Sequence, residues 1–234
     1  MKPIAIFRHS PTEGPGYFGE FLHARNIPWK LIAVDSGEPV PAAPEVYGGL
    51  VFMGGPMSVN DDLPWIPPVL TLIRQAAAAD IPTLGHCLGG QLISKALGGV
   101  VSANPTKEIG WGEICIEDNP VARAWFGEIR SFESFHWHGE TFSLPPDAVK
   151  LMSSAYCVNQ GFALGPHLGM QCHVEMTERM IDFWCRDGQA EITASRGPSV
   201  QTEEQMKTDA QHKLDALHGV ARKLYERWLE AVPR

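Results

Sequence analysis

Short apolar segments alternate with helix-forming stretches over the first half of the chain, and this alternation constrains the fold more than any other feature. The strand candidates are residues 2–9, 29–36, 48–55 and 81–87. The helix candidates between and after them are residues 16–26, 68–80 and 88–99. A βαβα succession folds into a parallel sheet with helices on both faces. The first half therefore predicts an open, mostly parallel α/β sheet.

The second half of the chain has a different pattern. Its strand candidates are closely spaced, with turn residues between them, at residues 100–105, 108–117, 131–142, 149–156 and 161–175. This spacing predicts a short antiparallel excursion before the parallel sheet resumes at residues 169–173.

The C-terminal segment carries apolar residues at helical spacing from about residue 199 to 229. We predict one domain over residues 1–195 and a helical extension over residues 196–234 that packs on it. A contact between two copies of the chain is the alternative use of that apolar stripe, so a homo-oligomer stays open.

Composition and charge exclude several classes of protein. The chain has 234 residues and a net charge of −8, without a lysine- and arginine-rich block, which argues against nucleic-acid binding. No apolar run is long enough to span a membrane, and the N-terminus reads as a strand rather than a signal peptide. We therefore expect a cytoplasmic protein. Its cysteines, five in number and without a CxxC pair, are expected to be reduced thiols.

The sequence GHCLGGQ, residues 85–91, places a cysteine at the corner between a strand and a helix. Gly85 and Gly89 flank Cys87 in the pattern G-x-C-x-G, the cysteine form of a nucleophile elbow. The glycines allow the strand and helix to approach closely, and the middle residue is held in a strained conformation. The helix N-terminus favours a thiolate. Cys87 is therefore a candidate nucleophile.

A thiol nucleophile needs a base, and His173 in GMQCHVEM has the most suitable surroundings. His173 and Glu175 stand at i and i+2 on a strand end, so their side chains point to the same face. Glu175 could orient His173 and stabilise its protonated form. The two glycines of MGGP, Gly54 and Gly55, expose backbone N–H groups that could hold an oxyanion together with the N–H of Leu88.

These motifs resemble those of the class I glutamine amidotransferases, which use a catalytic triad. G-x-C-x-G-x-Q, an upstream strand ending in GGP and a downstream QxHxE occur in the family's order. The chain is most similar to stand-alone proteins like the amidotransferase domain of GMP synthase. The resemblance implies a flavodoxin-like fold and a triad of Cys87, His173 and Glu175. It also implies that the following residues bind the oxyanion or the substrate: Gly54, Gly55, Leu88, Gln91 and the main chain near Trp137 and His138.

Three positions depart from the family pattern. The usual H-P-E is His173-Val174-Glu175, the aspartate of H-G-D is Glu140, and His86 stands where an aliphatic residue is commoner. None of these changes removes a chemical group that the triad needs.

The resemblance implies that Cys87 hydrolyses the side-chain amide of glutamine through a γ-glutamyl thioester. No phosphate-binding or dinucleotide fingerprint is present, so we expect no cofactor, and an enzyme that accepts the ammonia would be a separate chain. A stand-alone hydrolase of γ-glutamyl peptides or amines is the alternative enzyme. A non-catalytic regulatory module is another alternative. A metal held by His136 and His138 with His86 or another histidine is a further hypothesis, although we expect no metal site.

Overall fold

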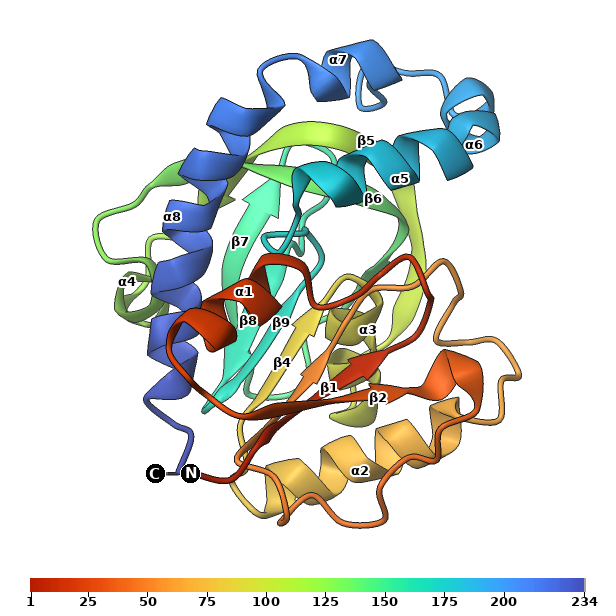
Figure 1. Ribbon diagram of the computed structural model, residues 1–234. Coiled ribbons are helices and arrows are strands. Elements are labelled where there is room, and N and C mark those ends of the chain that lie inside the picture. The colour runs from red at the N-terminus through yellow and green to blue at the C-terminus, as the bar shows by residue number, and fades with distance from the viewer. Residues whose placement is uncertain (234) are drawn as a thin grey trace.

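The structure is a computed structural model that describes residues 1–233. Its strands form one nine-stranded sheet in the order β2-β1-β3-β4-β9-β8-β7-β5-β6 (Figure 1). The five strands at one side run parallel: β2 (Trp29–Ala33), β1 (Ile4–Arg8), β3 (Gly49–Phe52), β4 (Thr83–His86) and β9 (His167–Met170). This order is that of a flavodoxin-like sheet, which confirms the predicted fold class.

The other strands extend the same sheet with antiparallel pairing. They are β8 (Gly161–Leu164), β7 (Val149–Ser154), β5 (Val101–Ile116) and β6 (Ser131–Phe142). The segments 100–105 and 108–117 were predicted as two strands but belong to one, β5. Its register against β6 shifts between Ala103 and Glu108, because Pro105 lacks the N–H that a regular ladder needs. Residues 161–175 were predicted as one strand, but a turn at Gly165 (φ 55°) divides them into β8 and β9. Strand β9 ends at Met170, so His173 and Glu175, predicted at a strand end, lie in the irregular segment that follows it.

Helices cover both faces of the sheet, as predicted. On one face α1 (Gly16–Ala24), α4 (Pro120–Phe126), α5 (Glu178–Asp187) and α8 (Ala210–Leu229) share a single core. On the other face lie α2 (Ile66–Ala78) and α3 (Leu88–Ala96). Strand β1 serves both cores because its side chains alternate: Ile4 and Ile6 join the first, and Ala5 and Phe7 join the second. The remaining helices are η1 (Val34–Ser36), α6 (Gln189–Ala194) and α7 (Glu203–Lys207).

The C-terminal segment forms two helices, α7 and α8, where one was predicted. Asp209, with φ 55°, breaks the helix between them. The apolar stripe of α8 is buried within the chain itself, and both Tyr225 and Trp228 are fully buried. Helix α8 runs along the first face of the sheet and contacts α1, α4, α5 and β6 (Figure 1). Arg234, the last residue of the predicted extension, lies outside the described residues.

Across residues 1–233, no helix combines the length and the apolar character that crossing a bilayer would require.

Candidate active site

Cys87 occupies a strained corner between β4 and α3. Its backbone has φ 49° and ψ −108°, a conformation that L-residues rarely adopt. The neighbouring glycines allow the close packing that holds this corner. A Cβ at Gly85 would collide with the backbone of Gly89, and one at Gly89 would collide with the carbonyl of Phe52 on β3. The glycines of the G-x-C-x-G pattern are therefore required by contact with neighbouring backbone.

Substitution of Gly89 by alanine is expected to destabilise the protein by about 3 kcal/mol, because the carbonyl of Phe52 belongs to the central sheet and has little room to move. Chemical denaturation would measure the change. The matched control is Gly219→Ala in α8, where no atom lies within 4 Å of the added Cβ. That control should stabilise the chain by about 0.5–1 kcal/mol through helix propensity. Equal effects at the two glycines would contradict this account of the corner.

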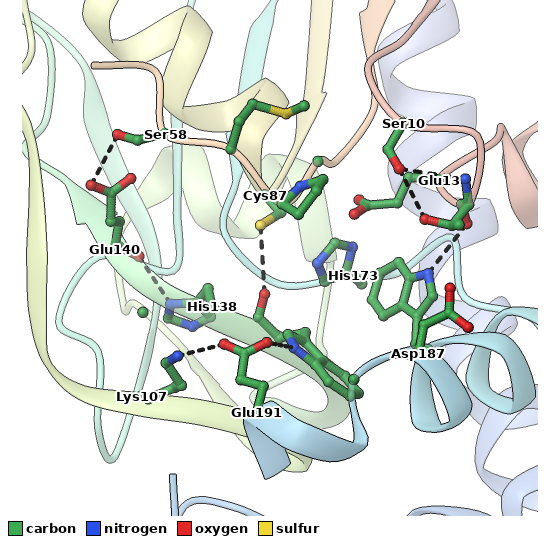
Figure 2. A pocket seen from close by; sticks show the side chains of 18 of the residues that line it. Ser10, Glu13, Ser58, Cys87, Lys107, His138, Glu140, His173, Asp187 and Glu191 are labelled. Atoms are coloured by element: carbon green, nitrogen blue, oxygen red, sulfur yellow. Dashed lines mark hydrogen bonds and ion pairs between the residues drawn. The ribbon is translucent and has the colours of Figure 1, made fainter. Parts of the chain in front are cut away.

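A cavity of about 530 Å³ opens above Cys87, near the ends of the parallel strands (Figure 2). The predicted site residues that line it are Gly55, Cys87, Gln91, Trp137, His138 and His173. Open α/β sheets bind ligands at this edge. The structure thus brings these six residues to one cavity, although they come from β6, α3, the β4–α3 corner and the segments after β3 and β9. The other predicted site residues, Gly54, Leu88 and Glu175, are not part of its lining.

The Cys87 sulfur has two polar neighbours. The Nε2 of Gln171 donates a hydrogen bond to Sγ at 3.4 Å, and the carbonyl oxygen of Trp137 lies 3.9 Å from Sγ. Gln91, which we expected to bind substrate, also donates to Gln171 Oε1 at 3.1 Å. Gln91 therefore orients the amide that contacts the sulfur. The role of Gln171 was missed, although the strand predicted over residues 161–175 places Gln171 on the same face as His173.

His173 and Glu175 form a buried pair. Nδ1 of His173 lies 2.7 Å from Oε1 of Glu175, and both side chains are almost fully buried. The other ring nitrogen, Nε2, has no hydrogen-bond partner among residues 1–233 and is available for proton transfer. Trp184 on α5 packs edge-on against the imidazole, with 4.8 Å between the ring centroids. This contact fixes the plane of the ring.

A second histidine, His86, lies near the carboxylate oxygen of Glu175 that His173 does not contact. Nε2 of His86 lies 3.7 Å from Oε2 of Glu175 and 3.2 Å from the hydroxyl of Tyr225 on α8. The family departure at position 86 is thus part of a buried chain of polar groups that runs from α8 to His173. Neither the role of His86 nor that of Tyr225 was predicted, because the contact spans 139 residues of sequence.

The charges of this network favour a protonated His173. Burial by itself would lower the pKa of His173, but the carboxylate of Glu175 and the sulfur of Cys87 outweigh it and raise the pKa well above its usual value. Burial would raise the pKa of Glu175, yet His86 and His173 lower it on balance. Burial lowers the pKa of His86, although the carboxylate of Glu175 acts in the opposite direction. The arrangement can hold an imidazolium beside the Cys87 sulfur.

The segment after β3 brings Gly54 and Gly55 beside the elbow. A Cβ at Gly55 would contact the Leu88 side chain at 2.7 Å, and one at Gly54 would lie 3.1 Å from Cε1 of His173. Leu88 is the first residue of α3, so its N–H has no acceptor within the helix. The backbone N–H groups near Cys87 are thus suited to an oxyanion.

The cavity wall on the β6 side of Cys87 is polar, and its side chains form hydrogen bonds and ion pairs with one another. Nε1 of Trp137 donates to Glu191 at 2.8 Å, and Glu191 forms an ion pair with Lys107. Glu140, in place of the family's aspartate, accepts a hydrogen bond from Ser58 at 3.0 Å. The carbonyl oxygen of Trp137 in this wall faces the Cys87 sulfur at 3.9 Å.

The hypothesis of a metal held by His136 and His138 with His86 or another histidine is not what the geometry shows. His86 belongs to the Glu175 network, and the polar cluster beside β6 consists of Glu108, His136 and His138, with ligand atoms within 4.8 Å of one another. The amide nitrogen of Gln160 lies among them, 2.7 Å from Glu108 Oε2 and 3.4 Å from each imidazole. An ion could enter only if this amide moved.

The sequence and structure were compared with known proteins. Residues 22–182 match the family model "Glutamine amidotransferase class-I", so the chain belongs to that family and is an enzyme of it. It is 29% identical to the glutamine amidotransferase-like protein YfeJ of Salmonella typhimurium, over 81% of this chain and 82% of that protein. It is 30% identical to a glutamine-hydrolysing GMP synthase subunit of Saccharolobus solfataricus, over 72% of this chain and 92% of that protein.

Two further proteins are informative. The chain is 27% identical to γ-glutamyl peptidase 2 of Arabidopsis thaliana, over 77% of this chain and 79% of that protein. The crystal structure of a glutamine amidotransferase from Methylobacillus flagellatus superposes with a TM-score of 0.97 at 41% identity, covering 100% of this chain and 96% of that one. The resemblance noted from the motifs is therefore confirmed over nearly the whole chain.

Proposed function

We propose that the chain hydrolyses the side-chain amide of glutamine, with Cys87 as nucleophile, His173 as acid and base, and Glu175 as the residue that orients His173. The observation that carries the proposal is the geometry of one cavity lined by Cys87 and His173. Cys87 has a strained backbone, and Nδ1 of the buried His173 lies 2.7 Å from Oε1 of Glu175. A thiolate next to an imidazolium is the reactive form of a cysteine nucleophile.

In the proposed reaction the Cys87 thiolate attacks the amide carbon, and the N–H groups of Leu88 and Gly55 hold the resulting oxyanion. His173 then gives its proton to the leaving nitrogen as the carbon–nitrogen bond breaks, which releases ammonia and leaves a γ-glutamyl thioester. Water loses a proton to His173 and attacks the thioester. Glutamate leaves, and the sulfur returns to the thiolate.

The proposal extends to partners and location. The chain acts in the cytoplasm, and a separate synthetase would consume the ammonia. The likeness to a GMP synthase subunit supports that arrangement. A hydrolase of other γ-glutamyl compounds is the second candidate, supported by the likeness to a γ-glutamyl peptidase.

Release of glutamate and ammonia from glutamine, compared with release of glutamate from γ-glutamyl peptides and amines, tests the proposal. Turnover of glutamine supports the amidotransferase reaction. Turnover confined to other γ-glutamyl compounds supports the second candidate. Turnover of none of them by the isolated chain would overturn hydrolysis as an activity of this chain alone.

A further inference from the structure

Glu13 is a carboxylate of the cavity that the reaction described above does not use. It lies in the loop between β1 and α1, where its N–H donates to the carbonyl of Ser10 at 3.0 Å. A Cβ at Gly54 would meet both Oε2 of Glu13 and Cε1 of His173. The Glu13 carboxylate therefore lies close to Gly54, in the segment proposed to hold the oxyanion, and to the imidazole of His173.

The Glu13 carboxylate has no partner of its own. Among residues 1–233, no group donates a hydrogen bond to it and no cation forms an ion pair with it. Burial raises its pKa to about 7, although the positive charge of His173 acts in the opposite direction. A carboxylate that faces a cavity and receives no hydrogen bond is suited to a ligand that donates hydrogen bonds to it.

The position of Glu13 relative to Cys87 determines which part of a bound substrate Glu13 can contact. Figure 2 shows Glu13 on the His173 side of Cys87, with Glu140, His138 and Lys107 across the cavity. His173 protonates the leaving nitrogen, so that nitrogen must depart toward the imidazole. Glu13 consequently faces the leaving group, and the wall of β6 faces the part of the substrate that remains attached to sulfur.

The size and charge of the cavity indicate which leaving groups it can accept. A volume of about 530 Å³ exceeds what free glutamine requires and is typical of sites for larger ligands. The lining carboxylates are Glu13, Glu140, Asp187 and Glu191. The one lysine of the lining, Lys107, already pairs with Glu191. A leaving group with a carboxylate would be repelled by Glu13, and one with an ammonium group would be attracted.

We propose that the site accepts γ-glutamyl amides whose leaving amine carries a second, positively charged amino group, and that Glu13 is the specificity-determining residue that binds this ammonium. The inference rests on the proposed Cys87-dependent hydrolysis. The reaction consumes one water and yields glutamate and a diamine. His173 supplies the proton to the departing nitrogen, as it does for ammonia.

Three substrates of similar length test the proposal: the γ-glutamyl amides of 1,4-diaminobutane, of pentylamine and of 4-aminobutyrate. They place an ammonium, a methyl or a carboxylate at the same point. Above pH 7, where Glu13 is ionised, the wild-type kcat/KM should favour the diamine amide over the pentyl amide by about tenfold. The carboxylate compound should be the poorest of the three.

Glu13→Gln should bring the ratio between the diamine and pentyl amides close to one. Glu140→Gln, on the opposite wall, is the matched control and should leave the ratio unchanged whatever it does to the separate rates. The wild type offers a test that needs no substitution: the preference should fade as the pH drops through about 7 and Glu13 becomes protonated.

Equal kcat/KM values for the diamine and pentyl amides in the wild type would overturn the role of Glu13 and leave hydrolysis standing. A preference that survives Glu13→Gln, or that follows Glu140→Gln instead, would overturn it equally. Absence of turnover of every γ-glutamyl compound, glutamine included, would overturn the proposed function itself.

Discussion

Replacing Cys87 by serine is expected to lower glutamine turnover by roughly four orders of magnitude or more. The serine hydroxyl occupies nearly the same volume but gives up its proton far less readily than a thiol. His173, whose pKa is raised well above its usual value, is already protonated and is a poor base toward a hydroxyl. Release of ammonia at saturating glutamine, measured in a coupled assay, would give the loss directly.

The control for this substitution is Cys115→Ser. Cys115 is an exposed free thiol on β5, so its replacement should leave turnover within about twofold of wild type. Thermal unfolding of the Cys87→Ser variant should resemble that of the wild type, because the change is nearly isosteric. A Cys87→Ser enzyme that kept a tenth of the wild-type rate would refute the assignment of the nucleophile.

Glu175→Gln is expected to lower turnover by about 10²- to 10⁴-fold. The amide removes the negative charge that lies 2.7 Å from Nδ1 of His173, so a buried imidazolium loses its hydrogen-bonded carboxylate. The pKa of His173 should then fall, because burial lowers it and the opposing carboxylate is gone. Fewer molecules would hold the proton that the leaving nitrogen requires.

A pH profile distinguishes this mechanism from simple damage to the fold. Activity in the wild type should decline only as the pH rises through the elevated pKa of His173, and in Glu175→Gln this decline should begin at lower pH. Glu178→Gln, at an exposed position in the first turn of α5, is the control and should keep the wild-type profile. An unshifted alkaline limb in Glu175→Gln would mean that Glu175 does not support the imidazolium.

The pKa shifts of His173 and Glu175 make the folding stability depend on pH at both the alkaline and the acid end. The raised pKa of His173 contributes stability that is fully present below about pH 6.5, the unfolded value, and is lost as the pH rises through the folded pKa. The lowered pKa of Glu175 contributes stability above its unfolded value of about 4.5, lost as the pH falls through the folded pKa.

Local sequence rules were sufficient for the elbow and for the parallel half of the sheet. Glycine at positions 85 and 89 marks a close approach of backbones, and the i, i+2 spacing of His173 and Glu175 correctly predicted that the two side chains meet, although both residues follow β9 rather than lie on it. The irregular β5 was harder to predict, because Pro105 suggests a break while pairing with β6 continues on both sides of it.

The surroundings of the triad could not be predicted from the sequence. Tyr225 reaches His86 only because α8 packs across the first face of the sheet, and Gln171 reaches Cys87 only because β9 pairs with β4. Glu13 lies in a loop whose composition resembles any turn, and its position at the cavity depends on how β1 and β3 end side by side. These contacts are set by tertiary packing and leave no periodic signal.

The positive φ of Cys87 implies that this enzyme holds its proposed nucleophile at a thermodynamic cost. Glycine adopts φ 49° and ψ −108° freely, so a chain with Cys87→Gly should be inactive and yet about 1 kcal/mol more resistant to unfolding than one with Cys87→Ala. Selection for thermal tolerance alone would therefore tend to erase the activity at this position. A cysteine at this position therefore lowers stability in exchange for reactivity.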